Sequence, residues 1–99
     1  MPNDDVTLCA IFRVPAEGLT AFQEYEAAVL SLLQDHHGEL QRRLRNGDGT
    51  TEVHVIRFSS SAALDGYRAD PRRTALAHLF VASGAVAEVL TVADVSCRD

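Results

Sequence analysis

The strongest constraint on the fold of this chain is a hairpin signal at its centre, the run Asn46-Gly47-Asp48-Gly49. Asn-Gly and Asp-Gly tolerate the positive φ angles that a tight turn between antiparallel strands requires. The flanking segments 39–45 and 51–58 alternate between polar and apolar residues, the first of them weakly. The pattern therefore predicts two antiparallel neighbours, with residues 39–45 as a polar edge strand.

Two more strands and two helical regions complete the predicted element order. Residues 6–14 are apolar on both faces, as expected of a strand covered on both sides, and residues 86–95 hold the last strand. Residues 18–36 carry a helical apolar stripe that only Glu26 interrupts. The second helical region spans 62–69 and restarts over 72–82, with Asp70 as N-cap and Pro71 at the first position.

This order, βαββαβ, predicts an α+β, ferredoxin-like fold. Right-handed crossovers give an antiparallel four-stranded sheet in the order 4-1-3-2, with two helices on one face. The 99 residues make one domain, 1–99. Alternation along residues 51–58 places Val53 and Val55 on the face away from His54, and Ile11 joins them there. An apolar outer face needs a cover, so we expect a homodimer through the sheet faces.

Composition excludes several classes of function. The formal net charge of −5 disfavours nucleic acid, and no apolar run approaches the ~20 residues of a membrane span. Two cysteines are too few for a disulfide scaffold or a zinc cluster, so free thiols are expected for Cys9 and Cys97. The histidines show no metal-ligand spacing, and neither a metal nor another cofactor is expected. The acidic, polar start is not a secretory signal, and the cytoplasm is the expected compartment.

One stretch carries a family resemblance. It runs Phe58-Ser59-Ser60, then Ala63-Leu64, Tyr67 and Asp70-Pro71-Arg72-Arg73. This stretch resembles the third strand and second helix of the dimeric α+β barrel superfamily. Its members include antibiotic-biosynthesis monooxygenase-like, haem-degrading monooxygenase and muconolactone isomerase-like proteins, together with families of unknown function. The resemblance implies two ferredoxin-like subunits packed sheet to sheet, and it fixes no single activity.

The resemblance also suggests a pocket between the sheet and the helices. In the monooxygenase branch an aromatic residue at the end of the third strand faces this pocket, and Phe58 matches it. A polar residue upstream on that strand, often Asn, is matched by His54. Haem-degrading members would have Trp where Phe58 stands, and this chain contains no Trp.

The candidate site residues have both functional and structural interpretations. The catalytic candidates are His54 as a base, with Tyr67 or His78 assisting; the ligand-binding candidates are Phe58, Phe22, Tyr25 and Arg13. Alternatively, His54 is a core histidine bonded to a backbone carbonyl, Tyr67 is a core tyrosine, and His78 is solvated or at an interface. Arg13 could equally form an ion pair with Glu52 or Asp94.

Two functions remain open from the sequence. One is a small-molecule-binding homodimer that is non-catalytic or accessory. The alternative is a cofactor-independent monooxygenase or isomerase acting on a small apolar carbonyl or phenolic substrate. An open pocket lined by His54, Phe58 and Tyr67 would favour the enzyme, and a filled core would favour the binding protein.

Overall fold

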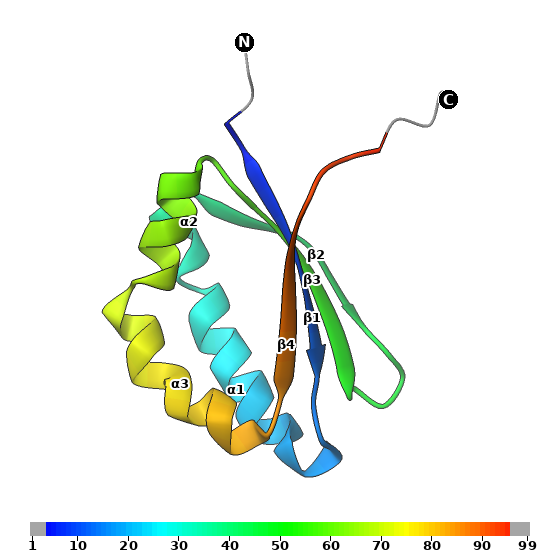
Figure 1. The fold of residues 1–99 in the computed structure, drawn as a ribbon. Helices are drawn as coiled ribbons and strands as arrows, with labels where there is room; N and C mark the ends of the chain where they lie inside the picture. Colours follow the sequence, from blue (N-terminus) through cyan, green and yellow to red (C-terminus); the bar gives the residue numbers. More distant parts are fainter. Residues whose placement is uncertain (1–3, 96–99) are drawn as a thin grey trace.

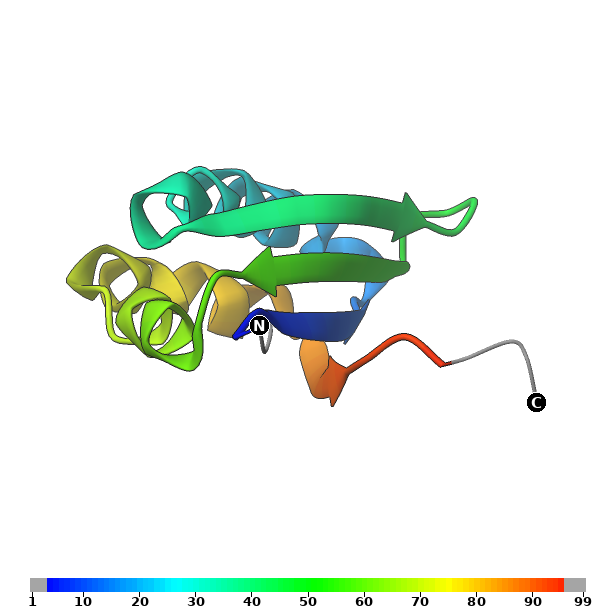
Figure 2. The same ribbon diagram turned by 90° about the horizontal axis from the view of Figure 1, so that it is seen from above.

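Four antiparallel strands form the sheet in the computed structural model, which describes residues 4–95. The strands are β1 (Val6–Arg13), β2 (Gly38–Arg45), β3 (Thr51–Phe58) and β4 (Val86–Val92). Their order across the sheet is β2-β3-β1-β4, which confirms the predicted 4-1-3-2 arrangement (Figure 2). The first and last strands end at Arg13 and Val92, before the predicted residues 14 and 95, because ladder pairing stops there.

Three α-helices lie on one face of the sheet (Figure 1): α1 (Leu19–Leu30), α2 (Ser61–Arg68) and α3 (Pro71–Ser83). The Ser60 hydroxyl caps α2 by accepting from the Ala63 N–H at 3.1 Å. The predicted N-cap Asp70 is confirmed, since its carboxylate accepts from the Arg72 N–H at 2.8 Å. The cap restarts the chain as a separate helix with a new direction, which is why the second region forms two helices.

The predicted continuous helix over 18–36 is wrong in its extent. The 3-10 turn η1 (Ala16–Gly18) precedes α1, and after Leu30 the chain passes into a second 3-10 turn, η2 (Leu33–His36). His37, at φ 54°, takes the left-handed position expected of Gly38. Gly38 is needed for a close approach instead, because a Cβ there would lie 2.7 Å from Cε1 of Phe58.

The two faces of the sheet are unlike. Leu8, Ile56 and Phe58 are buried beneath the helices, as the alternation predicted. On the opposite face, away from the helices, every strand contributes apolar side chains, which are interspersed with polar ones such as Arg42 and Glu88. We call it the outer face; its apolar members are Cys9, Ile11, Leu44, Val53, Val55, Val86, Leu90 and Val92.

Two further predictions concern the cysteines and membrane-spanning helices. Cys9 is a free cysteine, whereas Cys97 lies outside the described residues. No helix within residues 4–95 is long and apolar enough to cross a membrane.

Candidate functional site

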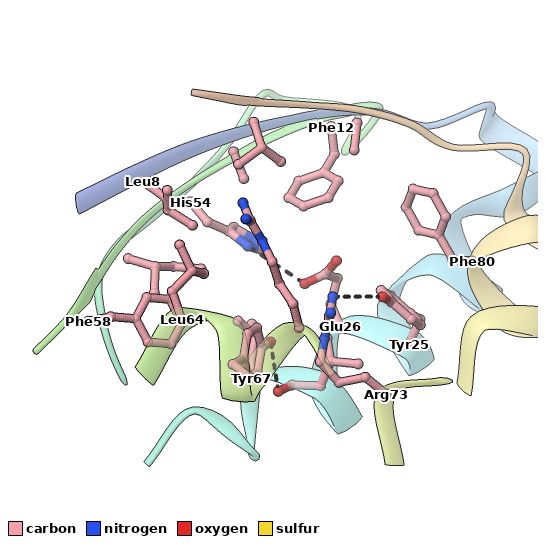
Figure 3. A pocket seen from close by; sticks show the side chains of 17 residues that line it. Leu8, Phe12, Tyr25, Glu26, His54, Phe58, Leu64, Tyr67, Arg73 and Phe80 are labelled. Carbon is pink, nitrogen blue, oxygen red and sulfur yellow. Dashed lines mark hydrogen bonds and ion pairs between the residues drawn. The ribbon is translucent and has the colours of Figure 1, made fainter. Parts of the chain in front are cut away.

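A cavity of about 260 Å³ lies between the inner face of the sheet and the three helices (Figure 3). Its walls are mostly aliphatic and aromatic side chains from β1, β3, β4 and the helices. Polar groups enter at a few places: His54 from β3, Tyr25 and Glu26 from α1, Tyr67 from α2, and two arginines, Arg68 and Arg73. An apolar cavity with few polar groups is the usual form of a small-molecule site.

His54 is the buried centre of a row of ionisable side chains. Its side chain is 1% exposed, and its Nε2 lies 2.7 Å from Oε1 of Glu52. On the other side of the ring, Nδ1 lies 3.6 Å from Oε2 of Glu26. The side-chain partner on Nε2 is thus a carboxylate, and not the backbone carbonyl of the structural interpretation. Phe12 packs against the imidazole with ring centroids 5.0 Å apart.

Glu52 is held in its charged form. Burial alone would raise its pKa, but hydrogen bonds from His54, Arg43 and Arg45 outweigh burial and lower the pKa to about 2. Arg43 and Arg45 share the face of Glu52 and His54 because they are their register partners on β2. Their Nε atoms donate to the two carboxylate oxygens at 2.5 and 2.9 Å. Arg13 is therefore not the partner of Glu52.

The charge on Glu52 fixes the tautomer of His54. Burial lowers the pKa of His54 from its ordinary value, although the bond to Glu52 opposes this, so the ring is neutral at pH 7. An ionised carboxylate can only accept, so Nε2 carries the proton and donates it to Glu52. Nδ1 then keeps its lone pair, directed toward Glu26 at the cavity wall.

Glu26 is the unusual residue of α1. It is 2% exposed, and burial together with the negative charge of Glu52 raises its pKa to about 7. Neutral and ionised Glu26 are therefore both well populated near neutral pH. Two carboxyl groups on either side of one imidazole thus have widely separated pKa values, the arrangement expected where acid and base roles are divided.

The two tyrosines play different parts. The Tyr67 hydroxyl donates to the Val29 carbonyl at 3.0 Å, and burial raises its pKa to about 12. Tyr67 therefore contributes its ring to the cavity while its proton is engaged elsewhere. The Tyr25 hydroxyl accepts from Arg73 at 3.3 Å, and the Arg73 guanidinium lies 4.5 Å from the centre of the Tyr67 ring.

The structure brings four of the seven candidates to the cavity: His54, Phe58, Tyr25 and Tyr67 (Figure 3). The other three lie elsewhere. Phe22 is fully buried in the neighbouring cluster with Phe12, and Arg13 is exposed at the end of β1. His78 is exposed on α3, where its ring nitrogen bonds to the Ala75 carbonyl one turn away.

Three side chains at or beside the cavity were not predicted from the sequence as site residues: Glu26, Glu52 and Arg73. Glu26 had a signal, since it alone broke the apolar stripe of its helix, and Glu52 shares a strand face with His54. No local pattern in the sequence distinguishes Arg73 from its neighbour Arg72. Across residues 4–95, no three His, Cys, Asp or Glu side chains form a group that could hold a metal ion.

Comparison with known proteins gives the fold. No protein-family model matches the chain, and no curated protein does. Among solved structures, SnoaB, a cofactor-independent oxygenase from Streptomyces nogalater, has a TM-score of 0.76 at 19% identity, covering 97% of this chain and 99% of SnoaB. The structure of a Mycobacterium tuberculosis protein has a TM-score of 0.74 at 19% identity, and the match covers 96% of this chain and 99% of that one.

A third similar structure comes from Caulobacter crescentus and is named as a candidate antibiotic biosynthesis monooxygenase. Its TM-score is 0.73 at 11% identity, covering 93% of this chain and 92% of its own. At such low sequence identities, the structural similarity shows a shared fold but not a shared reaction. This chain thus has the ferredoxin-like α+β fold of antibiotic-biosynthesis-monooxygenase-like proteins, as the resemblance implied.

Proposed function

We propose that this protein is an enzyme that binds a small, largely aromatic molecule in the cavity and removes a proton from it with His54. The cavity, at about 260 Å³, lies below the range of about 300–1,000 Å³ typical of drug-sized ligands. A substrate of one or two rings suits that volume. The pocket is lined by His54, Phe58 and Tyr67, the condition that favours the enzyme over the accessory binding protein.

The observation that carries the proposal is the bond between Glu52 and His54. When Nδ1 accepts a proton, the ring becomes an imidazolium whose Nε2–H already points at an ionised carboxylate 2.7 Å away. Glu52 then stabilises the charge formed in the reaction and orients the ring, the role that the buried aspartate plays beside the histidine of a Ser-His-Asp triad. Glu26, beside Nδ1, can exchange that proton as its own pKa lies near neutrality.

Proton removal next to a carbonyl leaves an electron-rich enolate. Return of the proton to another atom completes an isomerisation. With dioxygen as co-reactant, a CH₂ group becomes a carbonyl: one oxygen atom enters the product, and the other leaves as water with the two protons. The substrate supplies all four electrons, so neither route needs a flavin or a metal. The oxygenase route is supported by SnoaB, which shares the fold.

We also propose that the protein works as a homodimer through the outer face. All four strands contribute apolar side chains to that face, and Leu44, Val86, Leu90 and Val92 are exposed on it. No helix within residues 4–95 covers it. A second copy of the same face would remove this apolar area from water.

Proton exchange tests the enzymatic proposal directly. Indan-2-one is a bicyclic ketone with acidified CH₂ groups, and in D₂O the loss of their ¹H signals reports proton removal. We expect wild-type protein to exchange it at least about tenfold faster than His54→Ala. His78→Ala, the matched control outside the cavity, should equal the wild type.

Binding of the same ketone separates the two functions left open by the sequence. Saturation-transfer NMR detects the bound ketone whether or not exchange occurs. Binding with no acceleration over buffer would identify an accessory binding protein and overturn the enzymatic proposal. Oxygen uptake measured during exchange distinguishes an oxygenase from an isomerase.

A further inference from the structure

We infer that Arg73 and Tyr25 form a subsite for a carboxylate carried by the ligand, so that the natural ligand is a small aromatic acid. This inference rests on the proposed function of the cavity and adds the chemical class of the molecule that it takes. The two side chains come from α3 and α1 and meet at the cavity wall (Figure 3).

One hydrogen-bond donor of the Arg73 guanidinium lacks an acceptor among the described residues. Its Nε is buried and has no partner among residues 4–95. The guanidinium also forms no ion pair with a carboxylate in this part of the chain, whereas Arg72, its neighbour, pairs with Asp35 and Asp70. A buried donor without a partner is destabilising, so a ligand that brings an acceptor to this wall of the cavity is favoured.

The surrounding residues hold the guanidinium in one place. Tyr67 lies beneath it at 4.5 Å, a cation–π distance. Tyr67 is itself fixed by its bond to the Val29 carbonyl and by its contact with Phe58, with ring centroids 5.4 Å apart. A fixed planar guanidinium needs little reordering to bind a carboxylate, which is the anion that its fork of donors matches.

Tyr25 supplies a second donor. Its oxygen accepts from Nη2 of Arg73 at 3.3 Å, so its own O–H proton is directed elsewhere. A ligand carboxylate near this pair can therefore accept from Nε of Arg73 and from the Tyr25 hydroxyl. Tyr25 is held by packing against Phe80, with ring centroids 5.3 Å apart.

The charge of the cavity agrees with an anionic ligand. Its lining contains two arginines, Arg68 and Arg73, against a single carboxyl group, Glu26, whose pKa is raised to about 7. Glu52 is already neutralised by Arg43 and Arg45. Permanent positive charge in a cavity of apolar walls favours a group that is anionic before any reaction, and the walls favour an aromatic body.

Two isosteric probes test the inference: naphthalene-2-carboxylate and its neutral counterpart naphthalene-2-carboxamide. Titration calorimetry at pH 7.5 should show the wild type binding the carboxylate at least about tenfold more tightly. Arg73→Gln should bring the ratio of the two dissociation constants close to one while leaving that of the carboxamide unchanged. Arg72→Gln, which removes the neighbouring arginine that pairs with Asp35 and Asp70 outside the cavity, should keep the wild-type ratio.

Tyr25→Phe keeps the ring and removes one donor, so it should weaken carboxylate binding several-fold even if Arg73→Gln unfolds. Equal affinities in the wild type, a preference that survives Arg73→Gln, or no binding of either probe would each overturn the inference. Exchange of indan-2-one, a ketone without a carboxylate, stays an independent readout. His54-dependent exchange without carboxylate preference would mean that only the subsite is wrong.

Discussion

Nε2 of His54 and Oε1 of Glu52 lie 2.7 Å apart, with both side chains 1% exposed. The two residues are successive side chains on one face of β3, so their Cβ atoms are separated along the strand. Here Arg43 and Arg45 hold the carboxylate from the neighbouring strand. The strand pair β2–β3 thus sets the charge of Glu52, and Glu52 sets the tautomer of His54.

Glu52→Gln should lower the rate of indan-2-one exchange by about 100-fold, within the range attributed to positioned acid–base groups. The amide keeps the shape but removes the charge that stabilises the imidazolium. In the wild type the rate should rise with pH through a midpoint below 6.5 and then level off, because burial lowers the pKa of His54. Glu39→Gln, an exposed control on β2, should change neither rate nor midpoint. Full activity in Glu52→Gln would contradict the assigned role.

Glu26→Gln should alter how stability depends on pH. Burial raises the pKa of Glu26 from 4.5 to about 7, so the folded state binds a proton more tightly than the unfolded state. The wild type therefore loses stability as pH rises from about 4.5 through about 7, by up to about 3 kcal/mol from this group. Gln does not titrate, so the free energy of unfolding of the variant, relative to that of the wild type, should rise over that pH interval.

Urea unfolding at pH 5 and pH 8 measures the effect of Glu26. The free energy of unfolding of Glu26→Gln, relative to wild type, should be higher at pH 8 than at pH 5. Glu24→Gln, on the exposed side of the same helix, provides the control. A constant difference between variant and wild type at the two pH values would contradict the raised pKa.

Asp70→Ala should lower Tm by about 5 °C or more, because one carboxylate serves three partners. It caps α3 through the Arg72 N–H, bonds to the Arg72 side chain and lies 2.7 Å from Nε2 of His36. Asp70→Asn keeps a side-chain acceptor at the N-cap, so its Tm should fall by less than that of Asp70→Ala. Asp65→Ala, exposed on α2, is the control.

The pH dependence of Asp70 gives a second check by thermal melting. Bonds from the Arg72 side chain, and then from His36, lower the pKa of Asp70. The ionised Asp70 carboxylate therefore stabilises the folded protein fully at pH values above its pKa in the unfolded state. This stabilisation is lost as the pH falls toward the lower pKa of the folded state. The difference in Tm between wild type and Asp70→Asn should shrink in acid; a gap that widened there would contradict the lowered pKa.

Val55→Glu should convert the proposed dimer to a monomer that keeps its helical circular dichroism. Val55 lies on the outer face opposite Cys9, so the glutamate would be solvated in a monomer but buried without a partner in the dimer. Val81→Glu, on the exposed side of α3, should leave the dimer intact. Sedimentation velocity at micromolar concentration decides the matter, and a monomeric wild type would rule out the dimer.

The sequence by itself determined the order of the elements, the strand order and the two faces of the sheet. These follow from local signals. Alternation along residues 51–58 selects which side chains face the helices, the turn at 46–49 pairs two strands, and Asp70 with Pro71 starts a helix. The same alternation placed His54 and Phe58 on one face, and the family resemblance implied that this face borders the cavity.

Only the tertiary structure decided what meets His54. Glu26 is far from His54 in the chain, and its oxygen comes within 3.6 Å only when α1 docks on β3. Arg73 reaches the cavity and Arg72 does not, because the turn of α3 after its cap directs successive side chains to different sides. Sequence periodicity predicts the face on which a residue lies. The position at which a helix packs on a sheet, however, depends on the packing of the whole core. That packing brings Glu26, His54 and Arg73 together at the wall of one cavity.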